Sequence, residues 1–405
     1  MTGVLVTDGH WRKTLAVVRS LGRKGIRVTV GERTFLNTSF FSKYCSRRIV
    51  YPSPRRHPDP FIEFLLEEIK KNRTHCLFPM EEETLLLVAK YRAEISKYTT
   101  LLIPDLEKIK FVRDKGKLLR FAEDHGIPIP QTRYSLENPN PDMIRGGSPV
   151  SNVVQGKSPA SYVVQGPAVI KPRISSGSFG IAYVSEGEDL LPSYQRVHAR
   201  YPFPLVQDWI PDGGGIFGVS ALFDEASNVK AAFVHKKLRM YPVKGGPSTL
   251  REGVDDPRVM ELGLSLLKSL KWVGVALVEF KVDPRDGIPK LMEVNPRFWG
   301  SLQLAIDSGV DFPYLISKMA RGETFQPVLH YEPGRRCRWL LWGDIFHFVT
   351  NPHRFSLQPS FFRFFEPNTS YDILSKEDPG PVLGSMATAL TFLYDPEMKR
   401  FLERR

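Results

Sequence analysis

The segment Leu291–Gly300, with the sequence LMEVNPRFWG, contains the residues whose types and spacing best suit chemistry. Glu293, Asn295 and Arg297 follow one another at every second position. On a β-strand this spacing directs all three side chains to one face. Carboxylate and amide oxygens are hard ligands for Mg²⁺, and a planar guanidinium binds phosphate oxygens. The segment is therefore predicted to hold Mg²⁺ against a polyphosphate.

The preceding strand adds a second carboxylate to this face under one geometry of the connecting turn. Two apolar runs flank the turn, which is the pattern of a β-hairpin. A three-residue loop at 285–287, ending on a left-handed glycine, pairs Pro284 with Ile288. Counting outward from that pair places Glu279 opposite Glu293, and cross-strand partners share a face. A two-residue loop would put the two acids on opposite faces, and a solvated hairpin face is the alternative to a metal site.

Length and composition indicate a globular chain of several domains. A chain of 405 residues predicts two to four domains, and 42% hydrophobic with 25% charged residues is typical of a soluble protein. No apolar run reaches the roughly 18 residues of a membrane span. Residues 1–13 lack the basic and apolar regions of a signal peptide. The three cysteines are far apart without a CxxC spacing, so we expect free thiols and a cytoplasmic location.

The positive charge is concentrated at the N-terminus. The formal net charge is +12, and residues 1–60 contain 12 Lys and Arg against 3 Asp and Glu. A basic domain is compatible with nucleic acid, an anionic membrane, an acidic small substrate, or a solvated surface without a partner. No helix-turn-helix, zinc-finger or RNA-binding aromatic signature accompanies it. We therefore predict no nucleic-acid partner.

The first part of the chain is predicted to be a parallel α/β domain. Residues 3–32 have the pattern of a β-α-β unit, and alternating helices and strands continue to about residue 110. The first strand meets its helix at Asp8-Gly9-His10, a junction where open parallel sheets bind anionic ligands. The GxGxxG dinucleotide pattern is missing there. His10, Arg12 and Lys13 either face a ligand or cap the turn.

Two further segments have unusual composition. Residues 148–156 and 158–166 are near duplicates with seven of nine positions identical, which predicts a surface hairpin or loop inserted at 140–166. The segment 331–405 is rich in Phe and Trp. It could dock on the core, form a homodimer face or touch lipid, and its balanced charge favours packing.

The order of motifs resembles the ATP-grasp superfamily, in its carbamoyl-phosphate synthase and carboxylate–amine ligase branch. The resemblance covers about residues 113–325 and depends on a helix lysine, a strand lysine before a Gly/Ser-rich loop, a VQDWI strand and the paired acidic strands. It implies an α/β fold of three parts. These are a Rossmann-like pre-ATP-grasp domain (1–112), an ATP-grasp core of two subdomains with antiparallel sheets (113–328) and a small aromatic-rich C-terminal extension (329–405).

The resemblance also implies a role for each matching residue. Contacts with ATP are implied for Lys115, Lys171, Ser176, Gly177, Ser178, Gln207, Asp208, Trp209 and Ile210. Two Mg²⁺ ions, with Mn²⁺ as an alternative, would be held by Glu279, Glu293 and Asn295. Arg297 would steady the transferring phosphoryl group and the tetrahedral intermediate. Lys237 and Arg239 are either further cations over the phosphates or parts of a solvated strand edge.

Two positions depart from the family pattern. Gln207 stands where members usually have glutamate. Gly215 and Ile216 stand where many have an acidic ribose ligand, so the ribose contact either comes from Asp212 or is absent. The implied activity is an ATP-dependent ligation of a small-molecule carboxylate to an amine through an acylphosphate, releasing ADP and phosphate. A phosphotransferase and a non-catalytic ATP-binding module are the alternatives.

Overall fold

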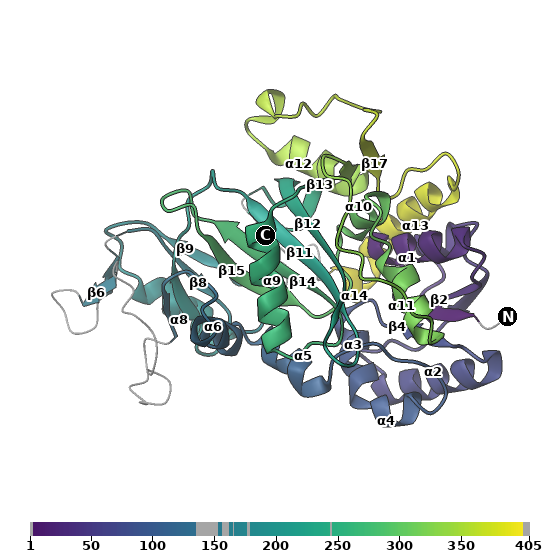
Figure 1. Cartoon of the computed structure of the whole chain (residues 1–405). Helices are drawn as coiled ribbons and strands as arrows, with labels where there is room; N and C mark the ends of the chain where they lie inside the picture. The colour runs from purple at the N-terminus through teal and green to yellow at the C-terminus, as the bar shows by residue number, and fades with distance from the viewer. Residues whose placement is uncertain are drawn as a thin grey trace. The chain divides into compact units, whose positions relative to one another are not determined.

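The computed structural model describes residues 3–134, 153–155, 162–164, 166–175, 179–243 and 245–399, and Figure 1 shows its helices and strands. The strands are β1 (Val4–Val6), β2 (Val28–Glu32), β3 (Arg47–Val50), β4 (Cys76–Phe78), β5 (Thr132–Arg133), β6 (Val153–Gln155), β7 (Tyr162–Val164), β8 (Ala168–Lys171), β9 (Ala182–Val184), β10 (Leu205–Asp208), β11 (Ile216–Phe223), β12 (Val229–Met240), β13 (Ser248–Gly253), β14 (Gly274–Val282), β15 (Pro289–Asn295), β16 (Arg336–Arg338) and β17 (Thr369–Tyr371). The helices are α1 (Arg12–Arg23), α2 (Pro58–Asn72), α3 (Glu82–Lys90), α4 (Arg92–Ile95), α5 (Leu106–Arg113), α6 (Lys115–Asp124), α8 (Leu191–Arg200), α9 (Pro257–Ser269), α10 (Leu302–Asp307), α11 (Phe312–Ala320), α12 (Ile345–Thr350), α13 (Gly380–Tyr394) and α14 (Pro396–Lys399). Three short helical turns are η1 (Ser39–Phe41), η2 (Leu340–Asp344) and η3 (Arg354–Ser356).

The chain divides into two compact units. The first contains residues 1–109, 219–277 and 295–405, and the second contains residues 110–218 and 278–294. The start of the second unit lies close to the predicted boundary between residues 112 and 113. The predicted core 113–328, however, contributes residues to both units, so the three-part division stays a prediction.

A parallel sheet of order β3-β2-β1-β4 begins the first unit. Val4 pairs with Val28 on one side and with Cys76 on the other, both in parallel register. All three residues of β1 are buried, as expected for a parallel strand covered on both faces. The predicted parallel α/β domain is confirmed, and polar residues such as Asp8 and Glu32 lie at the carboxyl ends of its strands.

A second, mixed sheet has the strand order β15-β14-β11-β12-β13-β16-β17. Within the first unit, β12 pairs antiparallel with β13, with an irregularity in register between Lys237 and Arg239. β13 pairs antiparallel with β16, and β16 pairs parallel with β17. The parallel and antiparallel sheets together confirm the predicted mixed α/β fold class.

The aromatic-rich extension packs within the first unit. The buried Arg19 of α1 donates to the carboxylate of Asp378 at 2.9 Å and to the carbonyls of Asp372 and Ile373. Phe348 contacts a group of extension rings at centroid distances of 4.3 to 5.6 Å, namely those of Phe355, Phe361 and Phe362. The extension is thus attached to α1, but five of its rings stay exposed, namely those of Phe346, Phe355, Phe362, Phe364 and Phe365. The predicted packing holds only in part, and the dimer and lipid alternatives remain untested.

The second unit contains an antiparallel sheet of order β5-β10-β8-β9. Leu205 and Gln207 of β10 pair with Lys171 and Val169 of β8. The duplicated segments contribute β6 and β7, whose pairing joins Val153 with Val164 in an antiparallel ladder. This pairing confirms the predicted hairpin for its described residues, and the rest of the 140–166 insertion lies mostly outside them.

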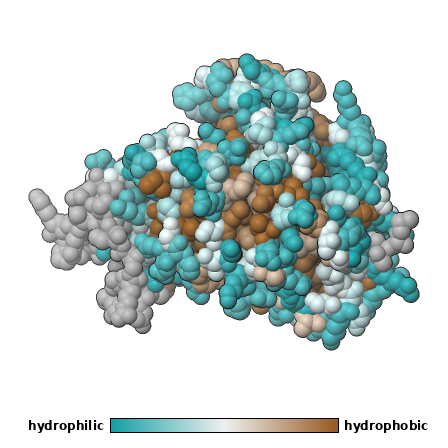
Figure 2. Space-filling model, viewed as in Figure 1, coloured by the Kyte–Doolittle hydropathy of each residue, from teal (hydrophilic) through white to brown (hydrophobic). Residues whose placement is uncertain are grey.

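Hydrophilic side chains cover most of the face shown in Figure 2, and apolar ones gather near its middle. Among the described residues, no helix combines the length and the apolar character that crossing a bilayer requires.

Candidate functional site

Two lysines and a glutamate come together in the second unit from three different elements. Lys115 is the first residue of α6, Lys171 ends β8 and Glu293 lies in β15. The Lys115 ammonium lies 3.8 Å from Glu293 Oε2. The pKa of Lys171 is lowered to about 8, chiefly by burial; the charges of Lys115 and Lys281 act in the same direction, and Glu293 opposes them. The structure therefore places the two predicted phosphate cations within electrostatic range of a predicted metal ligand.

Asp114 fixes the position of Lys115. Its carboxylate caps α6 by accepting from the Gly116 amide at 2.9 Å and from the Lys117 amide at 3.2 Å. The same carboxylate receives two bonds from the Arg173 guanidinium, at 3.0 and 3.1 Å. The Lys115 amide donates in turn to the Arg173 carbonyl at 2.9 Å. The start of α6 and the chain after β8 are thus bound to each other.

The predicted flap follows this contact along the chain. Ser176, Gly177 and Ser178 lie outside the described residues, so their role stays a prediction. The Lys115 ammonium donates to the Ser175 carbonyl at 2.9 Å, immediately before them. The Lys171 ammonium lies 3.9 Å from Met292 Sδ.

The hairpin before Glu293 differs from the predicted one. The Asp283 amide donates to the Ile288 carbonyl at 3.0 Å, and the Gly287 amide donates to the Asp283 carbonyl at 2.8 Å. The loop therefore has the four residues 284–287, and the predicted pairing of Pro284 with Ile288 is wrong. The left-handed conformation of Gly287 is confirmed by its φ of 71°.

Buried charge explains the longer loop. Asp283 is fully buried and receives bonds from Arg285 Nε at 2.8 Å and from the Lys290 ammonium at 2.8 Å. The hydrogen bonds from Arg285, followed by those from Lys290, hold the pKa of Asp283 far below its usual value. These bonds connect both sides of the loop to one carboxylate. The turn propensities of the loop residues do not reveal such bonds.

The four-residue loop changes the count along the two strands. Counting from the pair of Asp283 and Ile288 places Glu279 opposite Met292 instead of Glu293. Along β15, however, buried and half-exposed residues alternate except at Met292 and Glu293, which are both half-exposed. One extra residue in a strand produces such a change of phase. Glu279 of β14 is likewise half-exposed, so the burial pattern is compatible with a shared face for Glu279 and Glu293.

This donor set fits a magnesium site of the predicted kind. Two carboxylates and an amide on neighbouring strands are oxygen donors, which Mg²⁺ takes together with water and phosphate oxygens. The described residues contain no group of three or more His, Cys, Asp or Glu side chains placed to hold a metal ion. Substrate oxygens would therefore have to complete the coordination, and the site stays a prediction.

The predicted adenine strand occupies β10 and the residues after it. Gln207 is buried, and its side-chain amide donates to Thr132 Oγ1 at 2.8 Å, so its side chain joins β10 to β5. Burial raises the pKa of Asp208, against the effect of nearby cations. The amide of Trp209 donates to the Pro167 carbonyl at 3.0 Å, and Ile210 is buried. Contacts with adenine stay a prediction for all four residues of this strand.

Lys281 is a cation that the sequence reasoning missed. Its ammonium lies 2.8 Å from Asp212 Oδ1 and 5.6 Å from the centroid of the Trp209 ring. Asp212, the predicted ribose ligand, thus pairs with a lysine of β14. The signal was present in the sequence, because Lys281 follows Glu279 by two residues and therefore shares its face of the strand.

Three further predicted residues belong to the first unit. Arg297 donates to the Phe298 carbonyl at 3.0 Å, and its buried Nε has no hydrogen-bond partner among the described residues. It lines a small pocket with Pro79, Leu102 and other residues of this unit. Lys237 is half-buried on β12.

Arg239 has a different environment from the one predicted. Its guanidinium is 4% exposed and makes two bonds of 2.8 Å to the carboxylate of Asp344. Arg338 and Thr249 bind the same fully buried carboxylate. Burial lowers the pKa of Arg239, against the effect of Asp344. This buried pair joins β12 to the extension, and we correct the predicted phosphate contact of Arg239 to a structural role.

The candidate residues at the first strand junction also have partners. Arg12 donates to the Gly300 carbonyl at 2.9 Å and stacks 3.8 Å from the centroid of Trp339. The buried Lys13 ammonium lies 2.8 Å from Glu81 and donates to the Phe298 carbonyl. Both residues therefore hold the first unit together, and only His10 remains a candidate to face a ligand.

Comparisons with known proteins find sequence relatives of the chain. A family described as ATP-grasp in the biosynthetic pathway with Ter operon matches residues 230–341. The large chain of carbamoyl phosphate synthase from Thermotoga neapolitana is 24% identical over 348 residues, which cover 81% of this chain and 29% of that protein. The chain is similar to proteins of the ATP-grasp superfamily. It spans less than a third of the length of this curated relative.

Solved structures show the same fold. The biotin carboxylase domain of the 2-oxoglutarate carboxylase from Hydrogenobacter thermophilus superposes with a TM-score of 0.62 at 14% identity, covering 83% of this chain and 73% of that one. The L-amino acid ligase from Bacillus licheniformis gives a TM-score of 0.55 at 16% identity, covering 79% and 74%. At these identities the likeness concerns the fold of the chain and leaves its substrates open.

Proposed function

We propose that this protein is an ATP-dependent ligase that joins a small-molecule carboxylate to an amine through an acylphosphate, with release of ADP and phosphate. The observation that carries the proposal is the grouping of Lys115, Lys171 and Glu293 from three elements of the second unit. Burial lowers the pKa of Lys171, and the nearby charge of Lys115 acts in the same direction. A polyanion between the ammonium groups would relieve that repulsion.

The chemistry requires charge neutralisation around ATP. Phosphoryl transfer depends on positioning and on cations that offset the charge of the phosphate oxygens. We assign the two lysines to phosphate oxygens of ATP. Lys281, which lies close enough to influence Lys171, is a third cation of the same group.

Magnesium would be held by Glu279, Glu293 and Asn295, whose oxygens suit it. The bound ion would supply Lewis-acid stabilisation of the phosphate oxygens. The Hydrogenobacter structure was solved as a dimer with MgADP, ADP and bicarbonate, which supports Mg²⁺ with a nucleotide on this fold. We extend to this chain the nucleotide and the ion, but neither bicarbonate nor the dimer.

Arg297 is assigned to the developing negative charge of the acyl transfer. Its Nε is buried without a hydrogen-bond partner among the described residues, which leaves a donor for a substrate oxygen. Such a donor stabilises the tetrahedral oxyanion more than the planar carbonyl of the acylphosphate from which it forms. Lys237 stays a candidate for a contact with the same negatively charged substrate oxygens.

The test combines ADP release with chemical trapping of the intermediate. The full chain is incubated with MgATP, hydroxylamine and a panel of acids that includes amino acids and bicarbonate. A carboxylic acid substrate should give ADP and the matching hydroxamate, because hydroxylamine attacks an acylphosphate at carbon. ADP release with a phosphate ester and no hydroxamate would indicate the phosphotransferase instead, and Mg²⁺-dependent ATP binding without turnover would indicate the non-catalytic module.

Matched variants connect any activity to the site. Lys171→Met should abolish the trapped product, whereas Lys290→Met should retain it, because Lys290 serves the buried Asp283 of the loop. Circular dichroism of both proteins verifies folding. Equal activity of the two variants would contradict the assignment of the phosphate cations.

A further inference from the structure

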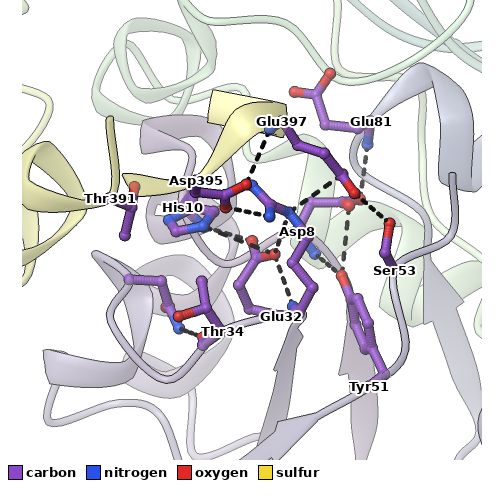
Figure 3. A network of polar contacts seen from close by, with 12 residues as sticks. Asp8, His10, Glu32, Thr34, Tyr51, Ser53, Glu81, Thr391, Asp395 and Glu397 are labelled. Atoms are coloured by element: carbon purple, nitrogen blue, oxygen red, sulfur yellow. Dashed lines mark hydrogen bonds and ion pairs between the residues drawn. The ribbon is translucent and has the colours of Figure 1, made fainter. Parts of the chain in front are cut away.

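A second concentration of charge lies in the first unit, at the carboxyl ends of the parallel strands β1, β2 and β3 (Figure 3). Asp8 follows β1, Glu32 ends β2, and Tyr51 follows β3. This edge of an open parallel sheet is where such folds bind ligands. No residue of the ATP site proposed above belongs to this group, so an inference from it goes beyond the proposed function.

Asp8 and Tyr51 are already committed to the fold. Asp8 Oδ2 accepts from the Glu81 amide at 2.9 Å and from Thr84 Oγ1 at 2.7 Å, at the start of α3. The Tyr51 hydroxyl accepts from the Asp8 amide at 2.9 Å. These bonds account for both side chains without a ligand.

His10 is different, because the fold leaves it unsatisfied. The residue is 6% exposed, and neither ring nitrogen has a hydrogen-bond partner among the described residues. The nearest carboxylate oxygen, Glu32 Oε1, lies 3.8 Å from Nε2, beyond hydrogen-bond distance. Burial, followed by the charge of Arg33, lowers the pKa of His10 to about 3. A neutral imidazole with one donor and one acceptor is thus buried without a partner, which is costly unless a further group completes it.

Cationic and hydroxyl groups lie at the same strand ends as His10. Carboxylates of the C-terminal segment (residues 395–399) bind these groups. Arg33 forms an ion pair with Asp395 and lies 3.5 Å from Glu397 Oε2. Ser53 Oγ donates to Glu397 Oε1 at 2.7 Å, and Arg56 Nε lies 3.0 Å from the same oxygen. Figure 3 shows Asp395 and Glu397 reaching toward the strand ends. Two carboxylates of the chain itself therefore lie where an anionic ligand would lie.

The attachment of this segment depends little on apolar packing. The buried residues of the preceding helix α13 are small or polar, namely Pro381, Gly384, Ser385, Thr388 and Thr391. Most of its large apolar residues are exposed, with Leu383 at 63% and Leu393 at 72% exposure, and Phe392 is half-buried. Met398 is the buried apolar anchor of α14. A segment held mainly by ion pairs and small contacts opens at low cost compared with a core element.

We propose that Arg33, Arg56, Ser53 and His10 form a binding site for a small-molecule anion that carries a carboxylate or phosphate group, and that Asp395 and Glu397 fill this site as internal ligands until that anion displaces them. The guanidinium groups supply the bidentate geometry that both groups prefer. The Ser53 hydroxyl and the His10 ring supply neutral hydrogen bonds. The internal carboxylates make the site selective for ligands that outcompete a tethered group.

The effect of the internal carboxylates on the affinity for an external anion can be predicted. A tethered carboxylate acts at an effective concentration on the order of millimolar, so an external anion binds weakly while the segment is closed. Neutralising the internal ligands should therefore raise the affinity for an external anion by about tenfold or more. The Asp395→Asn side chain keeps an oxygen for the bond that Asp395 accepts from the Glu397 amide at 2.9 Å. The substitutions Asp395→Asn and Glu397→Gln thus preserve side-chain shape while removing charge.

The experiment is calorimetric titration of the full chain with inorganic phosphate and, separately, with citrate. Two proteins are compared, and both carry Lys171→Met to remove a cation of the proposed ATP site. One has the native C-terminal segment, and the other also carries Asp395→Asn and Glu397→Gln. The double variant should bind at least one probe about tenfold more tightly, and adding Arg33→Gln should remove the gain. A gain with phosphate alone identifies a phosphate site, and a gain with citrate alone identifies a carboxylate site. No gain with either probe, or a gain that survives Arg33→Gln, overturns the proposal.

A second measurement needs only the Lys171→Met protein with its own C-terminal segment. Hydrogen exchange of residues 388–399 is followed with and without the probes at saturation. Displacement predicts faster exchange of this segment and slower exchange at residues 30–34. Unchanged exchange of residues 388–399 at saturating phosphate and citrate contradicts an internal ligand, whether or not the substituted proteins fold.

Discussion

The Lys115 ammonium of α6 lies 3.8 Å from the Glu293 carboxylate of β15, although 178 positions separate the two residues in the sequence. Lys115 is held by the cap of Asp114 and by Arg173, whereas Glu293 is placed by its strand. A lysine that reaches toward a metal-ligand candidate can contact the phosphates on which that metal would also lie. This pair is thus the meeting point of the two halves of the proposed ATP site.

Glu293→Ala should abolish ATP turnover and leave the fold intact. The substitution removes a half-exposed carboxylate that would bind Mg²⁺, so we expect the loss of at least about a hundredfold in kcat that follows removal of a charge-stabilising group. ADP release measures the activity, and urea unfolding measures the stability. Glu323→Ala is the matched control, because Glu323 pairs with Arg321 at a surface turn. Normal turnover in Glu293→Ala would contradict the assignment of Glu293 as a magnesium ligand.

Nucleotide affinity should fall as the pH rises through the pKa of Lys171, about 8. The protonated lysine attracts phosphate oxygens, and the neutral one loses that attraction above this pKa. In Glu293→Gln the carboxylate that raises the pKa is missing, so the loss of affinity should begin at lower pH. Fluorescent ATP titrations between about pH 6 and about pH 10 measure both proteins. A profile unaltered by Glu293→Gln would show that the two side chains are not coupled.

The fold class followed from the sequence because buried strand runs, helix periodicity and the motif order all agreed. The spacing of Glu293 and Asn295 correctly nominated a strand, but Arg297 lies beyond the end of β15 at Asn295, so the predicted strand position of Arg297 was wrong. The hairpin loop was not predictable, since its length depends on the buried Asp283 and on the cations that converge there. A count from loop length therefore gave the wrong loop and the wrong partner for Ile288, which pairs with Asp283.

Other errors had a similar cause. Arg239 looked like a free cation because the sequence does not show that Asp344, 105 positions later, is buried against it. The C-terminal carboxylates and Arg33 are still more distant from each other along the chain. Local patterns report which face a residue occupies, whereas long-range ion pairs are decided by tertiary packing. These pairs appear only once the elements are placed.

Glu32 should make the protein less stable as the pH rises from about 4.5 to about 7. Burial raises its pKa from 4.5 to about 7, so the folded protein retains a proton that the unfolded chain loses over this range. Below the range both states are protonated and the penalty vanishes; above it the penalty is complete. Glu32→Gln removes the titration. The stability of this variant relative to wild type should therefore increase with pH, by on the order of 3 kcal/mol.

The measurement is urea unfolding of both proteins at about pH 5 and about pH 8. Most other titrating groups are common to the two proteins and cancel in the difference, although Asp8, whose pKa Glu32 also raises, contributes in the same direction. A matched control is Glu67→Gln, an exchange on the exposed side of α2. A difference between Glu32→Gln and wild type that does not change with pH would show that Glu32 is ionised in the folded protein.

Arg239→Met and Lys237→Met should have opposite effects, although the residues are two positions apart on β12. Loss of Arg239 leaves the buried Asp344 with Arg338 and Thr249 but without its bidentate partner, so the free energy of unfolding should fall by about 2 to 4 kcal/mol. Lys237 is half-buried, and its removal should cost stability less than about 1 kcal/mol. Urea unfolding, with ADP release per folded molecule at low temperature, separates the two roles. If Arg239 contacted phosphate, its variant would keep its stability and lose kcat. If Arg239 is a structural partner of Asp344, the variant loses stability but keeps its kcat per folded molecule.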